Sequence, residues 1–480
     1  MHRLPLLIYL LFAGVFMFLV PPLETPDEGH HLNYINYVSR HLALPNQYVP
    51  EKSVIGEGHQ YPLYYMAGAA LVRLLQPDHG VDLTDVPNKK HRLLGGDSLT
   101  VPSFNHVGVD IFKTPSDRFA FYSLRALSVL FGLLTVFFIG RLAGLFIDDP
   151  RWAAFAAALA GTLPQFIFIS MSISNDSQSN ALAAAALFYM VKIAVSKDAA
   201  TDWKSHLWLA VALGLGIATK KSGLVLLIPA ALVLVRSAWR CQAHLIACHP
   251  ERSEGSHSAS RNLKTYSRVM RALAPAAVVI LVIAVLAGWV FVRNQALYGE
   301  LLGNRMEMKT LEPLGLVDEK TPTLPYVIND FLGPVGTSFV GMFGQWASHL
   351  PSAVNYFYLA LLILGSAGVA ISLKKKRVPP FSAFLLTTAL LATLGAVFYY
   401  NLTYTQPQGR LLFPALGATA VLAAVGLKEV VFLIKPPSWR FGLLAVLVLA
   451  LLAVDVVAVV HLNHFYYDPS QYAAAVFAGK

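Results

Sequence analysis

The strongest constraint on the fold is a series of apolar runs, each of about 18 to 25 residues, spread along the 480-residue chain. A helix of about 20 residues can cross the roughly 30 Å hydrocarbon core of a bilayer, where backbone amides must find their partners within the segment. Hydrophobic residues make up 56% of the chain and charged residues 13%, and the mean hydropathy is +0.55. These values exclude an ordinary soluble domain and predict an all-α polytopic membrane protein.

The apolar runs predict about 11 transmembrane helices. The first, at about 4–20, has Arg3 ahead of it and ends at Pro21-Pro22 without a small-residue cleavage site. We therefore interpret it as an uncleaved helix rather than a signal peptide. The others are expected at about 119–140, 152–171, 177–195, 206–218, 222–236, 272–292, 354–373, 381–400, 411–427 and 441–462.

Polar segments divide the chain into parts. A large first external loop is expected at 21–118, with amphipathic helices that lie along the membrane surface, and a second loop at 293–350. Residues 238–271 are basic and polar without an apolar period, which predicts a disordered cytoplasmic insertion. The expected organisation is an N-terminal transmembrane catalytic module at 1–237 and a C-terminal transmembrane module at 272–480.

The distribution of Lys and Arg predicts the orientation of the chain. The net charge of +10 is attributed to topology rather than to nucleic-acid binding. With the N-terminus in the cytoplasm, most basic short connections fall on the cytoplasmic side. Lys220, Lys221 and Arg410 are the exceptions, since they fall in short connections on the outer side. Cations placed against the topological bias suggest a specific role, so we expect an extracytoplasmic active site in a cell inner (plasma) membrane.

A polar stretch directly after the first span carries adjacent carboxylates, Asp27 and Glu28, followed by two imidazoles. Pro-Asp-Glu is a common start to a helix, so a simple helix cap is one interpretation. A positioned carboxylate can also take the proton from an attacking hydroxyl. Because the pair lies at the membrane boundary of the longest external loop, we predict that Asp27 and Glu28 are catalytic.

Four further acidic and imidazole residues are candidates for binding substrate or a divalent metal: Glu57, His59, His31 and Asp176. Their spacing matches no strong metal-ligand motif, so no cofactor is certain and a divalent metal stays open. Asp176 could instead cap the helix that follows it.

Four cations lie at outer helix ends: Lys220, Lys221, Arg293 and Arg410. Each could be an interfacial anchor whose aliphatic stem lies against the apolar helices. Together they could clamp a phosphate or pyrophosphate, because cations at low local dielectric bind such groups strongly. We predict that they bind the phosphate of a lipid-linked donor.

Five short motifs, spread from residue 26 to residue 414, resemble those of the C-type (GT-C) membrane glycosyltransferases, which include the protein O-mannosyltransferases and the lipid A aminoarabinose transferases. The last of them resembles more closely a bacterial branch of multi-spanning membrane proteins. The motifs are Pro26-Asp27-Glu28 with His31, Glu57-x-His59-Gln60-x-Pro62-Leu63-Tyr64-Tyr65, Ser174-Asn175-Asp176, Thr219-Lys220, and Gln408-Gly409-Arg410 with Pro414.

The resemblance implies transfer of a hexosyl or pentosyl group from a polyprenyl-phosphate donor to an acceptor glycan, lipid or protein at the extracytoplasmic face. It implies that Asp27 is the catalytic base or a metal-associated residue, with Glu28 as its neighbour. Glu57 and His59 match positions that approach a metal or the donor phosphate in some relatives.

This chain departs from the aminoarabinose transferases after Glu57, since it has Gly58 and Gln60-Tyr61 where they carry a lysine followed by two prolines. Phosphate contact by this segment and a metal requirement therefore stay open. Two other functions also stay open, a secondary transporter and a polysaccharide ligase or polymerase of the cell envelope. Membrane lipid is an expected partner in every case, and nucleic acid in none.

Overall fold

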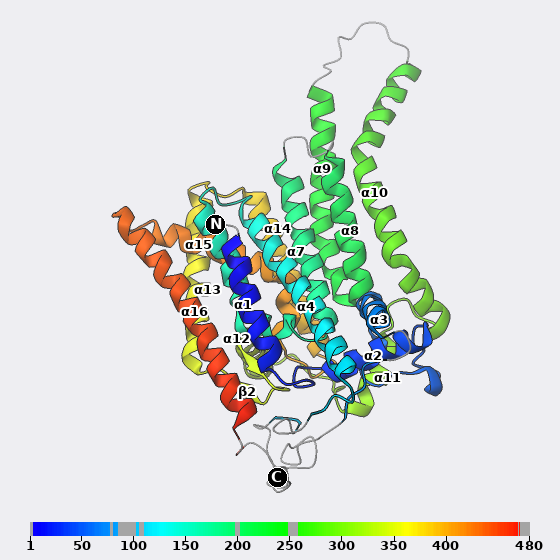
Figure 1. Cartoon of the computed structure of the whole chain (residues 1–480). Coiled ribbons are helices and arrows are strands. Elements are labelled where there is room, and N and C mark those ends of the chain that lie inside the picture. Colours follow the sequence, from blue (N-terminus) through cyan, green and yellow to red (C-terminus); the bar gives the residue numbers. More distant parts are fainter. Residues whose placement is uncertain are drawn as a thin grey trace.

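The computed structural model describes residues 3–76, 80–84, 102–104, 110–196, 202–247, 258–468 and 470, without the side chains of 241–272 and Leu314. It is 76% helical. Within the described residues the only sheet is an antiparallel hairpin of β1 (Met342–Phe343) and β2 (Ser348–His349). The prediction of an all-α polytopic membrane protein is confirmed (Figure 1).

The long helices form one bundle (Figure 1). They are α1 (Arg3–Leu19), α4 (Pro115–Ala143), α5 (Pro150–Gly161), α6 (Pro164–Ser170), α7 (Asn175–Val195), α8 (Trp203–Thr219), α9 (Leu227–Ala247), α10 (Ser258–Tyr298), α13 (Ser352–Lys374), α14 (Pro380–Asn401), α15 (Leu416–Val431) and α16 (Pro437–Tyr467). The shorter elements are α2 (Glu28–His41), η1 (Pro50–Lys52), η2 (Glu57–His59), α3 (Leu63–Leu75), η4 (Lys221–Leu226), α11 (Asn304–Leu311), η5 (Glu312–Leu314), η6 (Tyr326–Leu332), α12 (Gly333–Val340) and η7 (Gly409–Ala415).

Each of the predicted apolar segments forms helix, but the number of spans is not confirmed. Among the described residues, 8 helices are long and apolar enough to cross a membrane, or up to 9 if the bent pair α5 and α6 is one span. The helices α1 and α8 are each only 17 residues long. The predicted single helix at 152–171 is instead two helices bent by 64°. Pro164 explains the break, because proline has no N–H to donate and disfavours helical geometry at the preceding residue.

The predicted division into two modules is not visible as a separation in space. In the second half of the chain, α14 packs against α7 and α9, and α15 packs against α4 and α5. Helix also extends into the predicted insertion, since α9 continues to Ala247 and α10 begins at Ser258, while residues 248–257 lie outside the described residues. The domain boundaries at 1–237, 238–271 and 272–480 stay a prediction.

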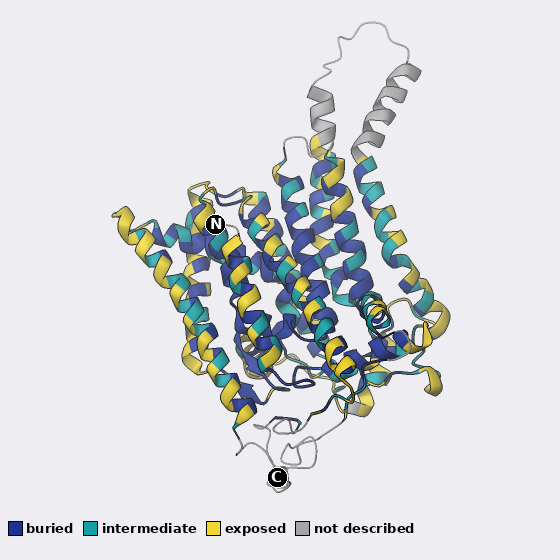
Figure 2. Cartoon of the chain, viewed as in Figure 1, coloured by how far each residue is buried: buried dark blue, intermediate teal, exposed yellow. Residues whose placement is uncertain are grey.

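At the centre of the bundle lies α7, with 78% of its apolar window buried. It packs against α4, α8 and α9, and its first half is rich in alanine. Small side chains allow helices in a membrane to approach closely. Figure 2 shows buried residues concentrated in the inner helices and exposed ones on the outer helices. The N-terminal turn of α7 is therefore fixed in the middle of one end of the bundle.

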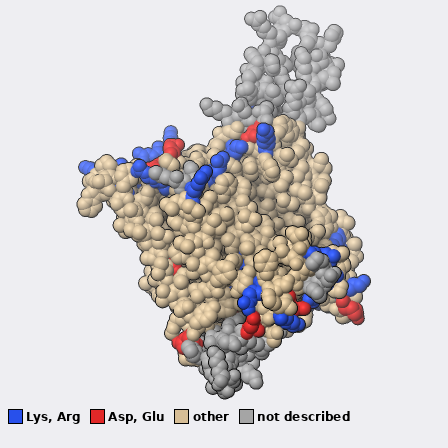
Figure 3. Space-filling model, in the orientation of Figure 1, with Lys and Arg blue, Asp and Glu red and all other residues tan. Residues whose placement is uncertain are grey.

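That end of the bundle carries the short elements α2, α3, α11 and β2, far from the N-terminus of the chain (Figure 1). The helices α2 and α3 lie within residues 21–118, the loop in which amphipathic helices were predicted. Figure 3 shows, on the visible face, that Lys, Arg, Asp and Glu lie mainly near the two ends of the bundle, with few of them in the broad band between. This distribution fits a bilayer around the band, because charged side chains are costly within hydrocarbon.

A buried ion pair fixes the start of the first loop to the bundle. Arg125, within α4, donates to both carboxylate oxygens of Glu28 at 2.9 and 2.7 Å, and both side chains are 0% exposed. The other partners are backbone groups: the carbonyls of Met17, Val20 and Pro21 for Arg125, and the N–H groups of Leu23 and Ile173 for Glu28. A buried pair needs such complete hydrogen bonding to offset the loss of hydration.

Replacing Arg125 by Met should leave the Glu28 charge buried without its cation. We expect a loss of about 3–5 kcal/mol in the free energy of unfolding, measured as a lower melting temperature in detergent. The matched control is Arg118→Met on the same helix, since Arg118 pairs with Asp110 at an exposed position and should change the melting temperature little. Equal losses in the two variants would contradict the anchoring role of Arg125.

Candidate active site

Four charged side chains from distant parts of the sequence form one array at the loop-bearing end. Arg410 lies at its centre: its Nη2 donates to Asp27 Oδ2 at 2.5 Å, and its Nη1 donates to Asp176 Oδ2 at 3.3 Å. Lys220 donates to the other carboxylate oxygen of Asp176. We call Asp27, Arg410, Asp176 and Lys220 the charged array. It brings together two carboxylates and two cations that were each predicted separately.

Every member of the charged array lies at a break or an end of a helix. Asp27 lies in the turn between α1 and α2, and Asp176 in the first turn of α7. Lys220 is the extended residue between α8 and η4, and Arg410 is the second residue of η7. Helix ends expose unpaired backbone groups and change the chain direction, so they occur where the bundle meets its polar loops. The array is thereby fixed at that boundary.

The position of Arg410 depends on close packing of η7 against α12. A Cβ atom on Gly409 would lie 2.2 Å from the backbone nitrogen of Phe339, so this position requires glycine. The N–H of Gly409 donates to Ser338 Oγ at 2.7 Å, and Gln408 accepts a hydrogen bond from Arg410 Nε. The Gln-Gly-Arg motif therefore orients the guanidinium toward the two carboxylates.

The side chain of Asp27 does not cap α2. Asp27 occupies the N-cap position with a left-handed φ of 61°, and its carboxylate makes no capping hydrogen bond. A left-handed conformation is unfavourable for a residue with a Cβ and persists where the surroundings determine it, often at functional sites. The Asp27 side chain is 36% exposed, whereas that of Arg410 is 6% exposed. Asp27 is therefore the carboxylate of the array that a substrate can reach from outside.

The charge of Asp27 is strongly stabilised. Burial raises the pKa of its carboxyl group, but the attraction of Arg410 outweighs this effect and lowers the pKa from 3.8 to about 2. At neutral pH Asp27 is ionised. A carboxylate held so strongly accepts a proton poorly for as long as Arg410 remains paired with it.

Asp27 also belongs to a possible metal site. One ligand atom from each of Asp27, His31 and Glu57 lies within 4.8 Å of the other two. Burial lowers the pKa of the His31 imidazole, and nearby Glu57 and Asp27 oppose this effect only in part. His31 is therefore neutral at pH 7, the form that ligates metals. Its Nδ1 is 2.8 Å from Tyr65 Oη. Two carboxylates and an imidazole suit a divalent cation.

Comparisons with known proteins show which fold this chain resembles. Residues 113–248 match the family model described as dolichyl-phosphate-mannose-protein mannosyltransferase. The structure of ArnT from Cupriavidus metallidurans bound to undecaprenyl phosphate is 12% identical with a TM-score of 0.50, over 96% of this chain and 74% of that chain. The fold of this chain is therefore similar to that of ArnT, and the match to a mannosyltransferase family model covers part of it, as the resemblance to GT-C enzymes implies. The recognition made from the five sequence motifs is confirmed.

A second GT-C structure, the apo oligosaccharyltransferase of Archaeoglobus fulgidus, is 16% identical with a TM-score of 0.48, over 98% of this chain and 56% of that chain. The present chain thus spans about half the length of that enzyme. Among curated proteins, none matches this sequence. The ArnT structure and the family model together support a multi-pass membrane protein with a GT-C-like fold.

Within the GT-C fold, the remaining predicted site residues lie outside the charged array. Glu28 forms a buried ion pair with Arg125. Its carboxylate therefore points into the bundle, away from the partly exposed carboxylate of the adjacent Asp27. Arg293 donates to the carbonyl of Pro45 in the first loop. These two contacts hold the first loop in place. The catalytic role of Glu28 and the phosphate-binding role of Arg293 stay predictions.

A second polar cluster surrounds Glu307, a residue of α11 that was not among the predicted site residues. Lys221 forms an ion pair with Glu307 and donates to Asn304 Oδ1 at 2.9 Å. His59 Nε2 is 3.9 Å from Glu307 Oε1, and His59 Nδ1 is 3.0 Å from the carbonyl of Gly56. Through Glu307, α11 therefore contacts His59 of η2 and Lys221, the neighbour of Lys220.

Of the residues that the sequence interpretation missed, Arg125 had a recognisable signal and Glu307 had none. An arginine within an apolar span is rare and needs a partner, so Arg125 could have been paired with an acidic residue of the loop. Glu307 lies in a polar loop among several charged residues, and nothing in its local sequence distinguishes it.

The lowered pKa of His31 predicts a pH dependence of stability. Since the folded pKa lies below the ordinary value of 6.5, folding favours neutral His31. Its contribution is fully present above pH 6.5 and is lost as the pH falls through the folded pKa. We expect the melting temperature in detergent to fall more between pH 7.5 and pH 5.5 for the unmodified chain than for His31→Gln.

The matched control for this measurement is His41→Gln, at the exposed end of the same helix. This variant should keep the pH dependence of the unmodified chain. A His31→Gln variant with an unchanged pH dependence would show that His31 is not held neutral by the fold.

Proposed function

We propose that this chain is a membrane glycosyltransferase that moves a sugar from a polyprenyl-phosphate donor to a hydroxyl acceptor at the extracytoplasmic face of a cell inner membrane. The observation that carries the proposal is the charged array, in which Arg410 binds both the partly exposed carboxylate of Asp27 and the buried carboxylate of Asp176. The GT-C fold, the matching mannosyltransferase family model and the ArnT structure bound to undecaprenyl phosphate support a lipid-phosphate donor. The N-terminus would then be cytoplasmic.

Lys220 and Arg410 are the groups that fit the donor phosphate. Both lie at helix breaks where the apolar band ends, so a lipid tail beside the helices would place its phosphate at their level. Within the array the charges of two cations and two carboxylates balance. A phosphate that binds Arg410 must therefore compete with Asp27. Asp27 is the partly exposed partner of the guanidinium, and its Oδ2 lies 2.5 Å from Arg410 Nη2. Charge-assisted contacts to phosphate are strong enough to compete.

Competition for Arg410 would activate Asp27. Once the phosphate shares the guanidinium, less positive charge stabilises the Asp27 carboxylate and its pKa rises toward the range useful for a base. The acceptor hydroxyl oxygen then bonds to the anomeric carbon while the bond from that carbon to the phosphate oxygen breaks. The hydroxyl proton passes to Asp27, and polyprenyl phosphate leaves with the bonding electron pair. Lys220 and Arg410 stabilise the charge that develops on the phosphate.

Asp27, His31 and Glu57 are the residues that would hold a divalent cation. Such an ion would supply further positive charge beside the leaving phosphate.

Asp27→Asn should reduce sugar transfer at least about 100-fold while the protein accumulates normally, because the amide cannot take the proton. The assay first compares lipid-linked sugars and surface glycans by mass spectrometry in cells with and without the chain, which identifies donor and acceptor. Transfer is then measured with purified variants. Glu51→Gln, an exposed acid of the same loop, is the control and should keep full activity.

Full activity of Asp27→Asn would remove the catalytic assignment. Solute uptake by reconstituted protein without any sugar transfer would favour a secondary transporter. Transfer of a complete polymer would favour a polysaccharide ligase.

Lys220→Met should weaken binding of the polyprenyl-phosphate donor by about 10- to 100-fold, the loss of one charge-assisted hydrogen bond. Lys221→Met is the matched comparison, because Lys221 pairs with Glu307 outside the charged array whereas Lys220 pairs with Asp176 within it. We expect Lys221→Met to change donor affinity less, although the sequence alone predicted a phosphate contact for both lysines. Binding is measured with polyprenyl phosphate in detergent micelles. Equal affinities of Lys220→Met and the unmodified chain would exclude Lys220 from the phosphate site.

A further inference from the structure

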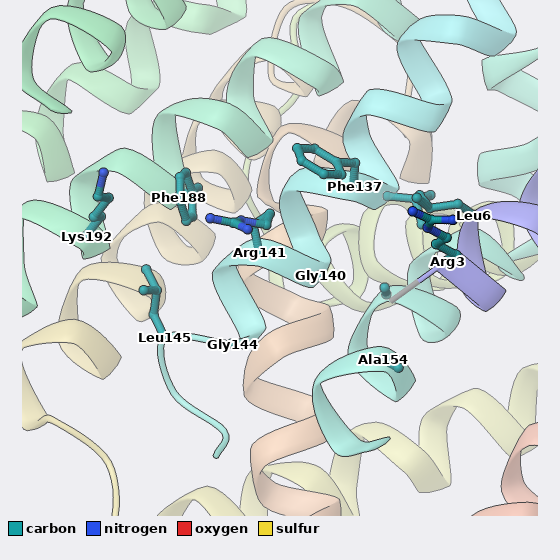
Figure 4. A pocket seen from close by; sticks show the side chains of 12 residues that line it. Arg3, Leu6, Phe137, Gly140, Arg141, Gly144, Leu145, Ala154, Phe188 and Lys192 are labelled. Carbon is teal, nitrogen blue, oxygen red and sulfur yellow. The ribbon is translucent and has the colours of Figure 1, made fainter. Parts of the chain in front are cut away.

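A cavity of about 620 Å³ is lined by the residues shown in Figure 4. It lies at the opposite end of the bundle from the charged array, because Lys192 is in the last turn of α7 and Asp176 is in its first turn. It lies between α1, α4, α5 and α7. Arg3 begins α1, Arg141 is in the last turn of α4, and Lys192 is in the last turn of α7. Asp27 and Asp176 lie at the other ends of α1 and α7. The cavity is thus separate from the site described above and belongs to the other membrane boundary.

The walls of the cavity are apolar. They include Leu6, Phe137, Leu145 and Phe188, with small residues where α4 faces α5. Phe137 is 42% exposed, and its neighbour Leu134 is 37% exposed, so the apolar lining continues onto the outer surface of α4. In a membrane this surface faces hydrocarbon chains. The shape and chemistry of the walls therefore suit an acyl chain rather than a water-soluble ion.

The rim of the cavity is positively charged, and its cations have no acidic partner at close range. Among the described residues, no hydrogen bond or ion pair joins Arg3, Arg141 or Lys192 to a carboxylate, although Lys192 acts on Asp202 at longer range. The Arg141 guanidinium lies 5.7 Å from the ring centroid of Phe188. Figure 4 shows Arg141 and Lys192 on either side of Phe188. This contrasts with the charged array, where each cation has a carboxylate.

We propose that this cavity binds one anionic diacyl phospholipid, with its headgroup phosphate held by Arg141 and Lys192 and an acyl chain lying along Leu6 and Phe137. Basic pockets between transmembrane helices recognise acidic lipid headgroups. The apolar walls exclude free phosphate as the natural ligand. A zwitterionic lipid carries a positive charge in its own headgroup, so its electrostatic attraction to the cations of the rim is weaker. The site is independent of the proposed glycosyl transfer.

The test uses the full chain, purified and delipidated in detergent, with dioleoylphosphatidylglycerol added in mixed micelles. Binding is followed by native mass spectrometry and by the melting temperature. We expect dioleoylphosphatidylglycerol to bind with one-to-one stoichiometry and raise the melting temperature. Dioleoylphosphatidylcholine and inorganic phosphate should bind much more weakly. Equal binding of the two lipids would overturn the proposal.

The variant Arg141→Gln/Lys192→Gln should lose about 30-fold in affinity for the anionic lipid. Lys374→Gln/Lys376→Gln is the matched control, because it removes two exposed cations from the same end of the bundle but outside the cavity. Equal losses of lipid affinity in the two double variants would show that general surface charge causes the binding, and would contradict a specific site in the cavity. Ala154→Phe fills the cavity without changing its charge and should also abolish one-to-one binding. Retention of binding by Ala154→Phe would contradict the proposed position of the acyl chain.

Discussion

The Arg410 guanidinium joins Asp27 and Asp176, which precede it in the sequence by 383 and 234 residues. An ionised group away from water is stable only when paired and fully hydrogen-bonded, so each member of the charged array determines where the others must lie. The turn after α1, the first turn of α7, the break before η4 and the turn η7 are thereby held at one boundary. A change in any of these helix ends would leave a charge unpaired.

The sequence singled out the four members of the charged array as candidates but did not predict how they pair, and it did not single out Arg125 or Glu307. Lys220 and Arg410 were identified because they fall on the wrong side for the topological bias, a signal that survives without a structure. The neighbours Asp27 and Glu28 could not be separated. They share one peptide bond, yet the Asp27 carboxylate is partly exposed and the Glu28 carboxylate lies within the bundle. That difference follows from the left-handed conformation of Asp27 and from Arg125 on a helix about 100 residues away, and neither is visible locally.

The fold was more predictable than the site, because long apolar runs have few alternatives in a membrane. The errors arose where helices break. The proline at 164 was a recognisable signal for the bend, and the sequence predicted the break between 206–218 and 222–236. The turn η7 depends on tertiary packing, since Gly409 lies against Phe339. Those breaks are also where the charged residues lie. Regular hydrophobic periodicity thus predicts the helices of the scaffold. The candidate site lies at the helix breaks, which periodicity describes least well.

The central helix α7 has a consequence for membrane thickness. Asp176 and Lys192 are 16 residues apart on a continuous helix, and at a rise of 1.5 Å per residue this separation is about 24 Å along the axis. The hydrocarbon core of an average bilayer is about 30 Å thick. Asp176 is paired within the bundle, so its charge does not meet hydrocarbon. A separation shorter than the hydrocarbon core nevertheless favours local thinning of the bilayer or a water-filled entrance toward Asp176. A membrane of greater thickness would increase this mismatch, so the chain should be sensitive to the acyl-chain length of the lipids around it.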